Sequence, residues 1–210
     1  MLKIGGFQPF TLTDYPGHLA AVVFTQGCNF RCPYCHNAAL LPVVVPQERL
    51  MPQERVFAFL KKRQGQLDGL VVTGGEPTLQ TGLPAFLKSV KSMGYRVKLD
   101  TNGSRPWVLA SLIEEGLVDF IAMDVKAPLE RYEKLAGVTV STRDLEESIA
   151  LIAWSRLPHQ FRTTVVPALH TPADLAQLEA MLPNASPHRM QHFVPDSTLD
   201  PRACGVEMVI

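Results

Sequence analysis

The sequence has no excess charge of either sign, no long apolar run and few cysteines. Lys and Arg total 20 and Asp and Glu total 20, so the formal net charge is zero. A neutral chain is not expected to capture nucleic acid or an anionic membrane through its overall charge. No stretch approaches the roughly 18 apolar residues of a membrane span. The first residues also lack a basic stretch followed by an apolar run, so no secretory signal is expected. We therefore expect a cytoplasmic protein with reduced thiols and with no nucleic-acid or membrane partner.

What the 210 residues do contain is the composition of a folded globular protein. Hydrophobic residues make up 46% and charged residues 19%, which is enough to bury a sizeable core. The 17 prolines are scattered, so they mark element boundaries and do not form a linker. No change of composition divides the chain. We predict one domain over 1–210, with an N-terminal segment 1–18, a barrel core 19–195 and a C-terminal segment 196–210.

Short apolar runs alternate with helical patterns along the chain. The predicted strands are 19–26, 69–73, 95–100, 120–125, 160–166 and 190–194, and the predicted helices are 52–65, 83–93, 104–116, 141–154 and 171–181. Repeated strand–helix units indicate a parallel sheet covered by helices, in the α/β class. A complete eight-unit barrel needs ~250 residues. An incomplete six-strand barrel is therefore favoured, with a doubly wound open sheet as the alternative. The residues after 194 are predicted either as a lid or as a last strand.

Three of the four cysteines lie within eight residues, at Cys28, Cys32 and Cys35, whereas Cys204 stands near the other end. Three thiolates on a short loop can hold three corners of an iron–sulfur cluster. The fourth iron then keeps an open coordination position, which substrate chemistry at a metal needs. A structural zinc site made by these cysteines and His36 is the alternative. Cys204 is expected to be a free thiol that behaves as a small apolar residue.

Other chemically suggestive residues also lie at the ends of predicted strands or just beyond them, except that Arg162 lies inside the predicted strand 160–166. They are Gly74-Gly75-Glu76-Pro77, Asp100-Thr101-Asn102-Gly103, the Asp124 and Lys126 pair, and Arg162. The carboxyl ends of parallel strands form one rim where ligands bind, so these motifs are predicted to converge on one site. The glycines suggest close approach of a ligand to the backbone, or else an ordinary turn. Charged residues on the barrel interior must pair with one another or with a ligand; the alternative is an exposed edge strand.

The segment CNFRCPYC followed by His36-Asn37 resembles the radical S-adenosylmethionine (SAM) enzymes. It most resembles the activating enzymes of glycyl-radical proteins, in which GGEP, DTNG, DVK and R-x₃-V-P occur in the same order. The resemblance spans roughly 10–195, and among subfamilies it is greatest to the anaerobic ribonucleoside-triphosphate reductase activating proteins. It implies an incomplete (β/α)₆ barrel of the TIM type. It also implies reductive cleavage of SAM at a [4Fe–4S] cluster and hydrogen abstraction from a glycine of a partner protein.

The resemblance further implies roles for single residues. Cys28, Cys32 and Cys35 would be the catalytic cluster ligands. Tyr34 would lie at adenine, and His36 beside the cluster. Gly74, Gly75 and Glu76 would contact the methionine part of SAM. Asp100 and Thr101 would lie at ribose or a monovalent cation, with Asp124 opposite, and Lys126 and Arg162 would meet carboxylate or ribose groups. With one spare cysteine, a single cluster is expected.

Asp14 lies in TDYPGH, which resembles the V-D-G-P-G segment that approaches the target glycine in activating enzymes. Tyr15 and His18 here replace a glycine and an apolar residue. The implied partners are a glycyl-radical protein, such as anaerobic ribonucleotide reductase, and a low-potential electron donor such as flavodoxin or ferredoxin. An incomplete barrel would leave a lateral opening for a loop of the partner.

One alternative is chemistry on a small molecule, as in 7-carboxy-7-deazaguanine synthesis, although Asp-Thr and not His-Asn usually follows the third cysteine there. The other is an iron–sulfur protein without catalysis.

Overall fold

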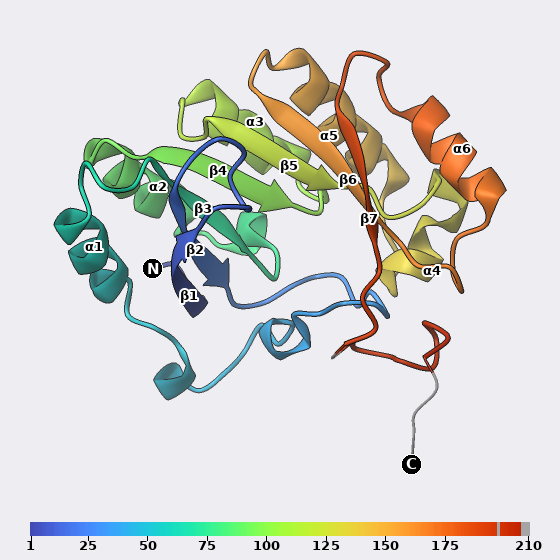
Figure 1. Ribbon diagram of the computed structural model, residues 1–210, viewed down its shortest axis with the longest axis horizontal. Coiled ribbons are helices and arrows are strands. Elements are labelled where there is room, and N and C mark those ends of the chain that lie inside the picture. The colour runs from blue at the N-terminus through green and yellow to red at the C-terminus, as the bar shows by residue number, and fades with distance from the viewer. Residues whose placement is uncertain (197, 207–210) are drawn as a thin grey trace.

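The computed structural model describes residues 1–196 and 198–206, and its strands form one curved, seven-stranded sheet (Figure 1). The strands are β1 (Ile4–Thr11), β2 (Ala20–Thr25), β3 (Gly69–Gly74), β4 (Arg96–Thr101), β5 (Phe120–Asp124), β6 (His159–Val165) and β7 (His188–His192). Each strand pairs with its neighbours in chain order; β2 to β7 are parallel, and β1 is antiparallel to β2. Strands β1 and β7 end the sheet without pairing with each other, so the barrel is open on one side.

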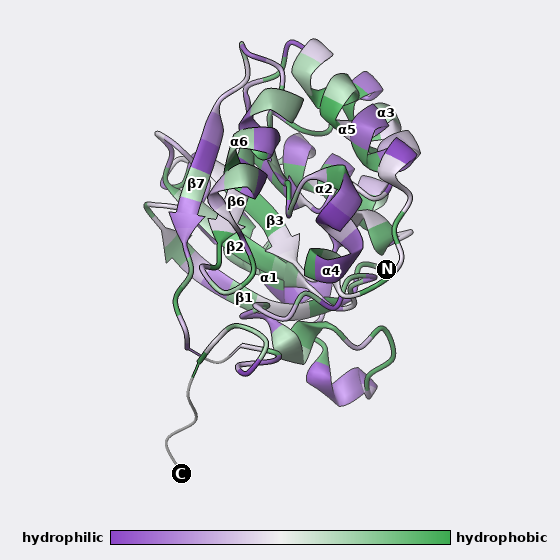
Figure 2. Ribbon diagram, turned by 90° about the vertical axis from the view of Figure 1, so that its right-hand side faces the viewer, coloured by the Kyte–Doolittle hydropathy of each residue, from purple (hydrophilic) through white to green (hydrophobic). Residues whose placement is uncertain are grey.

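Helices cover the outer face of the sheet between successive strands (Figures 1 and 2). They are α1 (Gln53–Lys62), α2 (Leu83–Ser92), α3 (Pro106–Glu114), α4 (Tyr132–Ala136), α5 (Thr142–Trp154) and α6 (Pro172–Met181). Short 3₁₀ turns lie at Ala38–Leu40, Gln47–Arg49, Pro77–Leu79 and Leu129–Arg131. None of the helices within 1–196 and 198–206 combines the length and the apolar character needed to cross a membrane.

The parallel strands separate an outer core from the barrel interior. Side chains alternate along a strand, so Val97 and Leu99 of β4 pack with the helices while Lys98 and Asp100 face inward. One end of the interior is closed by the ring of Tyr15, which is 2% exposed and packs with apolar side chains of β2 and β3. A Cβ atom at Gly69, the first residue of β3, would lie only 2.9 Å from the Tyr15 ring. The polar cavity described below therefore lies toward the other end, where the parallel strands finish.

The predicted incomplete barrel is confirmed, because six parallel strands follow one another without a reversal of order. A doubly wound sheet would contain such a reversal. Strand β1 was not predicted, because its sequence IGGFQPFT carries two glycines and a proline, which disfavour strands locally. Pairing with β2 overrides that local preference. The short helix α4 was also not predicted.

The C-terminal segment forms neither a strand nor a free lid within its described part. Residues 199–206 make turns that pack on the cysteine loop, with the Asp200 amide donating to the Pro33 carbonyl at 2.8 Å. The positions 197 and 207–210 lie outside the described residues, so the prediction for them stays open.

Candidate functional site

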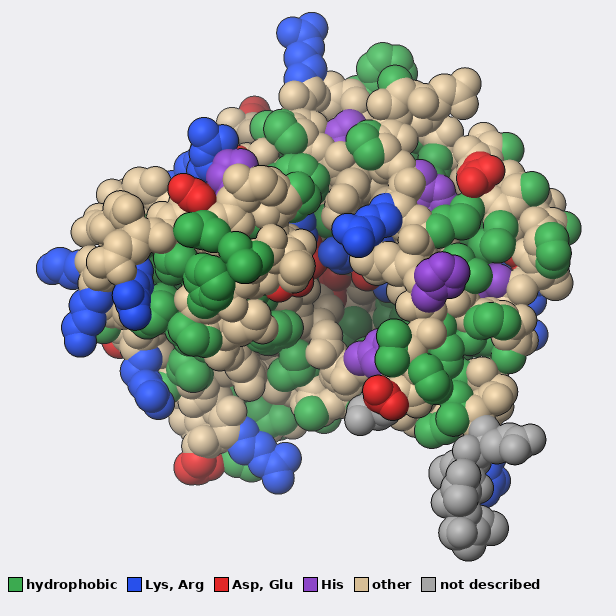
Figure 3. All heavy atoms as spheres, viewed as in Figure 1, with side chains coloured by type: hydrophobic (Ala, Val, Ile, Leu, Met, Phe, Trp, Pro, Cys, Tyr) green, Lys and Arg blue, Asp and Glu red, His purple; other side chains and the backbone are tan. Residues whose placement is uncertain are grey.

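A cavity of about 490 Å³ lies inside the barrel at the carboxyl ends of the strands, and all residues predicted for the site line it. They are Asp14, Cys28, Cys32, Tyr34, Cys35, His36, Gly74, Gly75, Glu76, Asp100, Thr101, Lys126 and Arg162. Figure 3 shows this hollow on the open face of the barrel, with acidic side chains at its floor. Asp124 lines the cavity as well. Asn102 and Gln191 also line it, and no role was predicted for these two side chains. Because the carboxyl ends of the parallel strands meet at one rim, motifs that are distant in sequence lie together in this cavity.

The loop after β2 presents three free thiols to the cavity. Cys28 and Cys32 are buried and Cys35 is partly buried. The loop is held by backbone bonds from the Cys28 amide to the Leu41 carbonyl at 3.1 Å and from the Cys35 amide to the Cys32 carbonyl at 3.0 Å. Burial raises the pKa of Cys28 to about 12 and that of Cys32 to about 11. These thiols are therefore neutral without a metal, and metal binding would release their protons.

The donors around the loop fit a multi-iron cluster better than a single zinc ion. Within 1–196 and 198–206, no three His, Cys, Asp or Glu side chains converge closely enough to hold one ion. In an iron–sulfur cube this convergence is not needed, because each thiolate binds a different iron. The Nε2 atom of His36 also lies 2.6 Å from the Val194 carbonyl oxygen, so it is engaged with the C-terminal segment. Cys204 is a buried free thiol, as predicted, and it is not among the residues that line the cavity.

The need for glycine at both positions at the end of β3 comes from the close approach of the neighbouring backbone. This approach was not predicted from the sequence. The Gly75 amide donates to the Thr25 carbonyl, and the Glu76 amide donates to the Gly27 carbonyl, each at 2.9 Å. A Cβ atom on Gly75 would lie 2.2 Å from the Gly27 carbonyl oxygen. The space left by the absent side chain is thus filled by the start of the cysteine loop, while both glycines still line the cavity.

Glu76 joins the loops that follow β3 and β4. Its Oε1 accepts from the Thr78 amide at 3.0 Å, the Thr78 hydroxyl at 2.5 Å and the Thr101 hydroxyl at 2.8 Å, and its Oε2 accepts from the Asn102 amide at 2.7 Å. Burial raises the pKa of this carboxyl, and the hydrogen bonds oppose the shift. The Asn102 side chain continues the network to Asn29, beside Cys28, at 2.9 Å. The Glu76 carboxylate therefore ties the strand-end loops to the cysteine loop.

Replacing Glu76 by glutamine should lower the free energy of unfolding by about 2 kcal/mol, because an amide NH₂ would face a backbone donor in a buried site. For a chain of this size the thermal midpoint should fall by roughly 6 °C. The matched control is Glu115→Gln, because Glu115 is partly exposed and bonds to Lys88; its midpoint should change little. Equal midpoints for the two variants in thermal denaturation would contradict the role assigned to Glu76.

Five charged side chains form a continuous network, four of them on the cavity floor and Lys98 beneath it. The Arg162 Nε donates to Asp124 Oδ1 at 2.8 Å, and its Nη1 donates to Asp100 Oδ2 at 3.2 Å. Lys126 donates to Asp124 Oδ2 at 3.0 Å, and Lys98 donates to Asp100 Oδ1. Burial opposes ionisation of Asp124, but Arg162 and Lys126 hold its pKa well below the usual range. Lys98 was not predicted as part of the site, although its position two residues before Asp100 on a strand places both side chains on one face.

Tyr34 adds an unsatisfied polar group to this mainly charged lining. Its side chain is 5% exposed, and its hydroxyl has no hydrogen-bond partner among the described residues. Buried hydroxyls are nearly always bonded, so an unpartnered one at a cavity wall suits a bound ligand.

Asp14 faces the cavity from the segment between β1 and β2, and its carboxylate accepts a hydrogen bond from the Thr11 hydroxyl. The two neighbouring departures from the activating-enzyme pattern have a structural explanation. The Tyr15 ring lies 4.6 Å from the His18 ring and 6.0 Å from the Phe120 ring, measured between centroids. These aromatic residues close one end of the barrel, whereas Asp14 next to them is exposed.

Comparison with known proteins matches residues 22–179 to the radical SAM superfamily. A Methanocaldococcus jannaschii protein, provisionally named a glycyl-radical enzyme activating enzyme, is 30% identical over 202 residues, which cover 94% of this chain and 82% of that protein. The pyruvate formate-lyase-activating enzyme of Staphylococcus epidermidis is 36% identical over 93 residues, which cover 42% of this chain and 37% of that enzyme.

The structure of Streptococcus suis SuiB bound to S-adenosylmethionine has a similar fold, with a TM-score of 0.63 at 13% identity over 82% of this chain and 40% of that one. The region matched to the superfamily includes the cysteine loop and the motifs after β3, β4 and β5. The chain therefore belongs to the radical SAM superfamily, as the sequence resemblance implied, and it is an enzyme of radical chemistry related to the glycyl-radical enzyme activating enzymes.

Proposed function

We propose that Cys28, Cys32 and Cys35 hold a [4Fe–4S] cluster and that the cavity binds SAM at the iron without a thiolate. The observation that carries this proposal is the convergence of three free thiols, an unpartnered tyrosine hydroxyl and a charged floor on one cavity of a radical SAM chain. When bound, the cluster and SAM supply reductive cleavage of a carbon–sulfur bond and hydrogen abstraction.

The residues of the chain bind and orient the cofactor in this proposal. Tyr34, which lines the cavity, packs against the adenine part, and the backbone at Gly74 and Gly75 lies at the methionine part. Lys126 and Arg162 keep N–H groups beyond those bonded to Asp124 and Asp100, and these suit a carboxylate or ribose oxygens. Glu76, Thr101 and Asn102 line the cavity beside the cofactor, and their bonds within the protein also fix the loops that they join.

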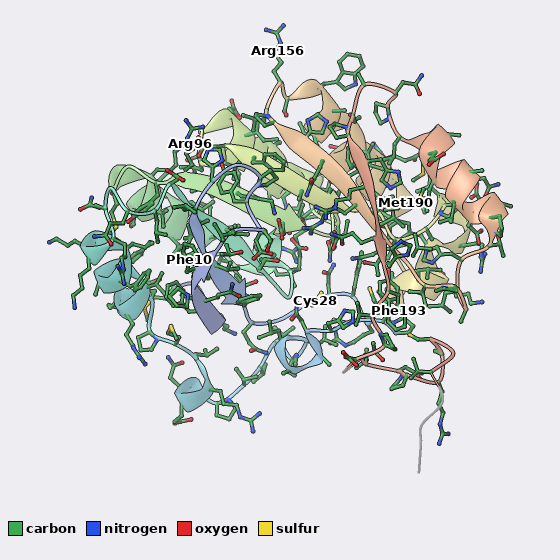
Figure 4. All side chains as sticks on the ribbon, viewed as in Figure 1. Phe10, Cys28, Arg96, Arg156, Met190 and Phe193 are labelled. Carbon is green, nitrogen blue, oxygen red and sulfur yellow. The ribbon has the colours of Figure 1, made fainter. Side chains whose placement is uncertain are left out.

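The second part of the proposal is that the substrate is a glycine in a glycyl-radical protein, with anaerobic ribonucleotide reductase as the specific target. Large apolar side chains are exposed at both unpaired ends of the sheet. Phe10 of β1 is 49% exposed, and Leu12 just beyond that strand is 66% exposed. Met190 of β7 is 36% exposed, and Val194 just beyond that strand is 53% exposed. Figure 4 labels Phe10 and Met190 on these two strands. Exposed apolar groups beside an opening suit contact with another protein. Asp14 at this opening is placed to meet the incoming loop.

The test is an anaerobic assay of the reconstituted protein with SAM and the ribonucleotide reductase. Dithionite serves as reductant first, and flavodoxin or ferredoxin then replaces it. We expect 5′-deoxyadenosine and a glycyl-radical signal in electron paramagnetic resonance (EPR), and no radical when the target glycine is replaced by alanine. Product formed without any radical on the reductase would contradict this target and favour a small-molecule substrate. Absence of 5′-deoxyadenosine from protein fully loaded with iron and sulfide would overturn the enzyme assignment.

A further inference from the structure

Lys98 is a buried lysine beneath the cavity that none of the proposed binding roles uses. Its side chain is 1% exposed, and its ammonium group donates to Asp100 Oδ1. Its Nζ atom also lies 6.0 Å from the centroid of the Phe120 ring, on the interior side of the barrel. A buried ammonium group is stable only when it is paired, so Lys98 and Asp100 form a fixed unit of the floor.

The resemblance to activating enzymes implies ribose or a monovalent cation near Asp100 and Thr101, with Asp124 opposite, and the side chains here do not fit the cation. Both Asp100 oxygens carry cationic donors, Lys98 on Oδ1 and Arg162 on Oδ2. Both Asp124 oxygens are likewise bonded, by Arg162 and Lys126. Three fixed cations thus face two carboxylates, and another cation at Asp100 would be repelled by the groups already there.

The side chain of Thr101 is already engaged within the protein. Its hydroxyl donates to Glu76 at 2.8 Å and accepts from the Gly103 amide at 3.1 Å. An alkali ion binds through several oxygen ligands, and the oxygens expected to supply them are already hydrogen-bonded within the protein.

We infer that the Lys98 ammonium is a built-in replacement for a soluble monovalent cation at Asp100, so that this protein needs none. The network of five side chains then carries three positive and two negative charges. Its net positive charge suits the carboxylate of an amino-acid ligand and not a free cation. The inference deepens the proposed function because it concerns the same cavity, but its test does not require turnover.

The test measures monovalent-cation binding to the reconstituted protein in two ways. Thallium-205 NMR reports binding of Tl⁺, which imitates K⁺, and thermal denaturation compares potassium chloride with choline chloride at equal ionic strength. Wild type should bind no Tl⁺ at Asp100 and should have the same midpoint in both salts. Lys98→Met should acquire a saturable Tl⁺ site and a midpoint about 3 °C higher in K⁺ than in choline, the size expected when the ion is present at roughly ten times its Kd.

The matched control is Lys91→Met, which removes another Lys–Asp pair, the one with Asp119 at 2.7 Å. This variant should show no response to the cation.

Saturable Tl⁺ binding by wild type that is lost in Asp100→Asn would overturn the inference, and so would a folded Lys98→Met protein that responds no more than Lys91→Met. If Lys98→Met does not fold, Lys98→Gln replaces it, and the wild-type titration is decisive by itself. Tl⁺ binding by a protein that still forms 5′-deoxyadenosine would refute this inference alone, whereas loss of that product without Tl⁺ binding would refute only the proposed function.

Discussion

Cys32→Ala should lose both the iron–sulfur cluster and the formation of 5′-deoxyadenosine, down to the level of protein without iron. Cys32 is 7% exposed and lines the cavity in the middle of the cysteine loop. Alanine removes one of three thiolates, and among the described residues no fourth cysteine lines the cavity to replace it. Iron and sulfide content, the visible absorption of the cluster and product formed from SAM with dithionite are measured on the same anaerobic sample.

The control for this experiment is Cys204→Ala. Cys204 is 5% exposed, so its loss removes a buried sulfur of comparable exposure, but it does not line the cavity. This variant should keep full cluster content and full product formation after any small loss of stability. Full turnover by Cys32→Ala, or equal loss of cluster in both variants, would show that the ligand assignment is wrong.

Gly75→Ala should strongly destabilise the protein. Its new Cβ would lie 2.2 Å from the Gly27 carbonyl oxygen, 2.6 Å from the Gly27 carbonyl carbon and 3.1 Å from the Leu40 carbonyl oxygen. All three contacts are backbone atoms, so no side-chain rotation can relieve them. We expect the free energy of unfolding to fall by about 3 kcal/mol and the thermal midpoint by roughly 9 °C. Cluster content should fall as well, because Gly27 directly precedes Cys28.

Gly94→Ala is the control for the glycine experiment. Gly94 has a φ of +86° and no atom within 4 Å of its ideal Cβ position. The alanine there carries only the backbone strain, about 1 kcal/mol, and should leave the cluster unaffected. A thermal midpoint for Gly75→Ala no lower than that of Gly94→Ala would mean that the two loops do not pack as described.

The sequence predicted the parallel strands because their patterns are local. GLVVTG and FIAMD are short, nearly continuous apolar runs, which is typical of strands buried on both faces. The rule that functional residues follow such strands then placed distant motifs on one rim, and the cavity confirms that placement. Strand β1 escaped prediction because its stability comes from pairing with β2 and not from its own residues.

Other features of the site depend on contacts that no local pattern contains. In RVKLDT of β4, Arg96 is exposed whereas Lys98 is fully buried, and the two residues have the same polar character in the sequence. The backbone segment that approaches Gly75 could not be predicted either, because it depends on where the loop after β2 lies in the fold. The same holds for the bond between His36 and Val194, which are 158 residues apart.

The most direct test of the central claim is the EPR spectrum of the reduced, reconstituted protein, recorded before and after SAM is added. We predict iron and sulfide in the ratio of one [4Fe–4S] cluster per chain and a signal whose g-values shift when SAM binds the iron without a thiolate. A spectrum that SAM leaves unchanged would show that this coordination position is closed by another group. A single tightly bound zinc ion in place of the cluster would contradict the account altogether.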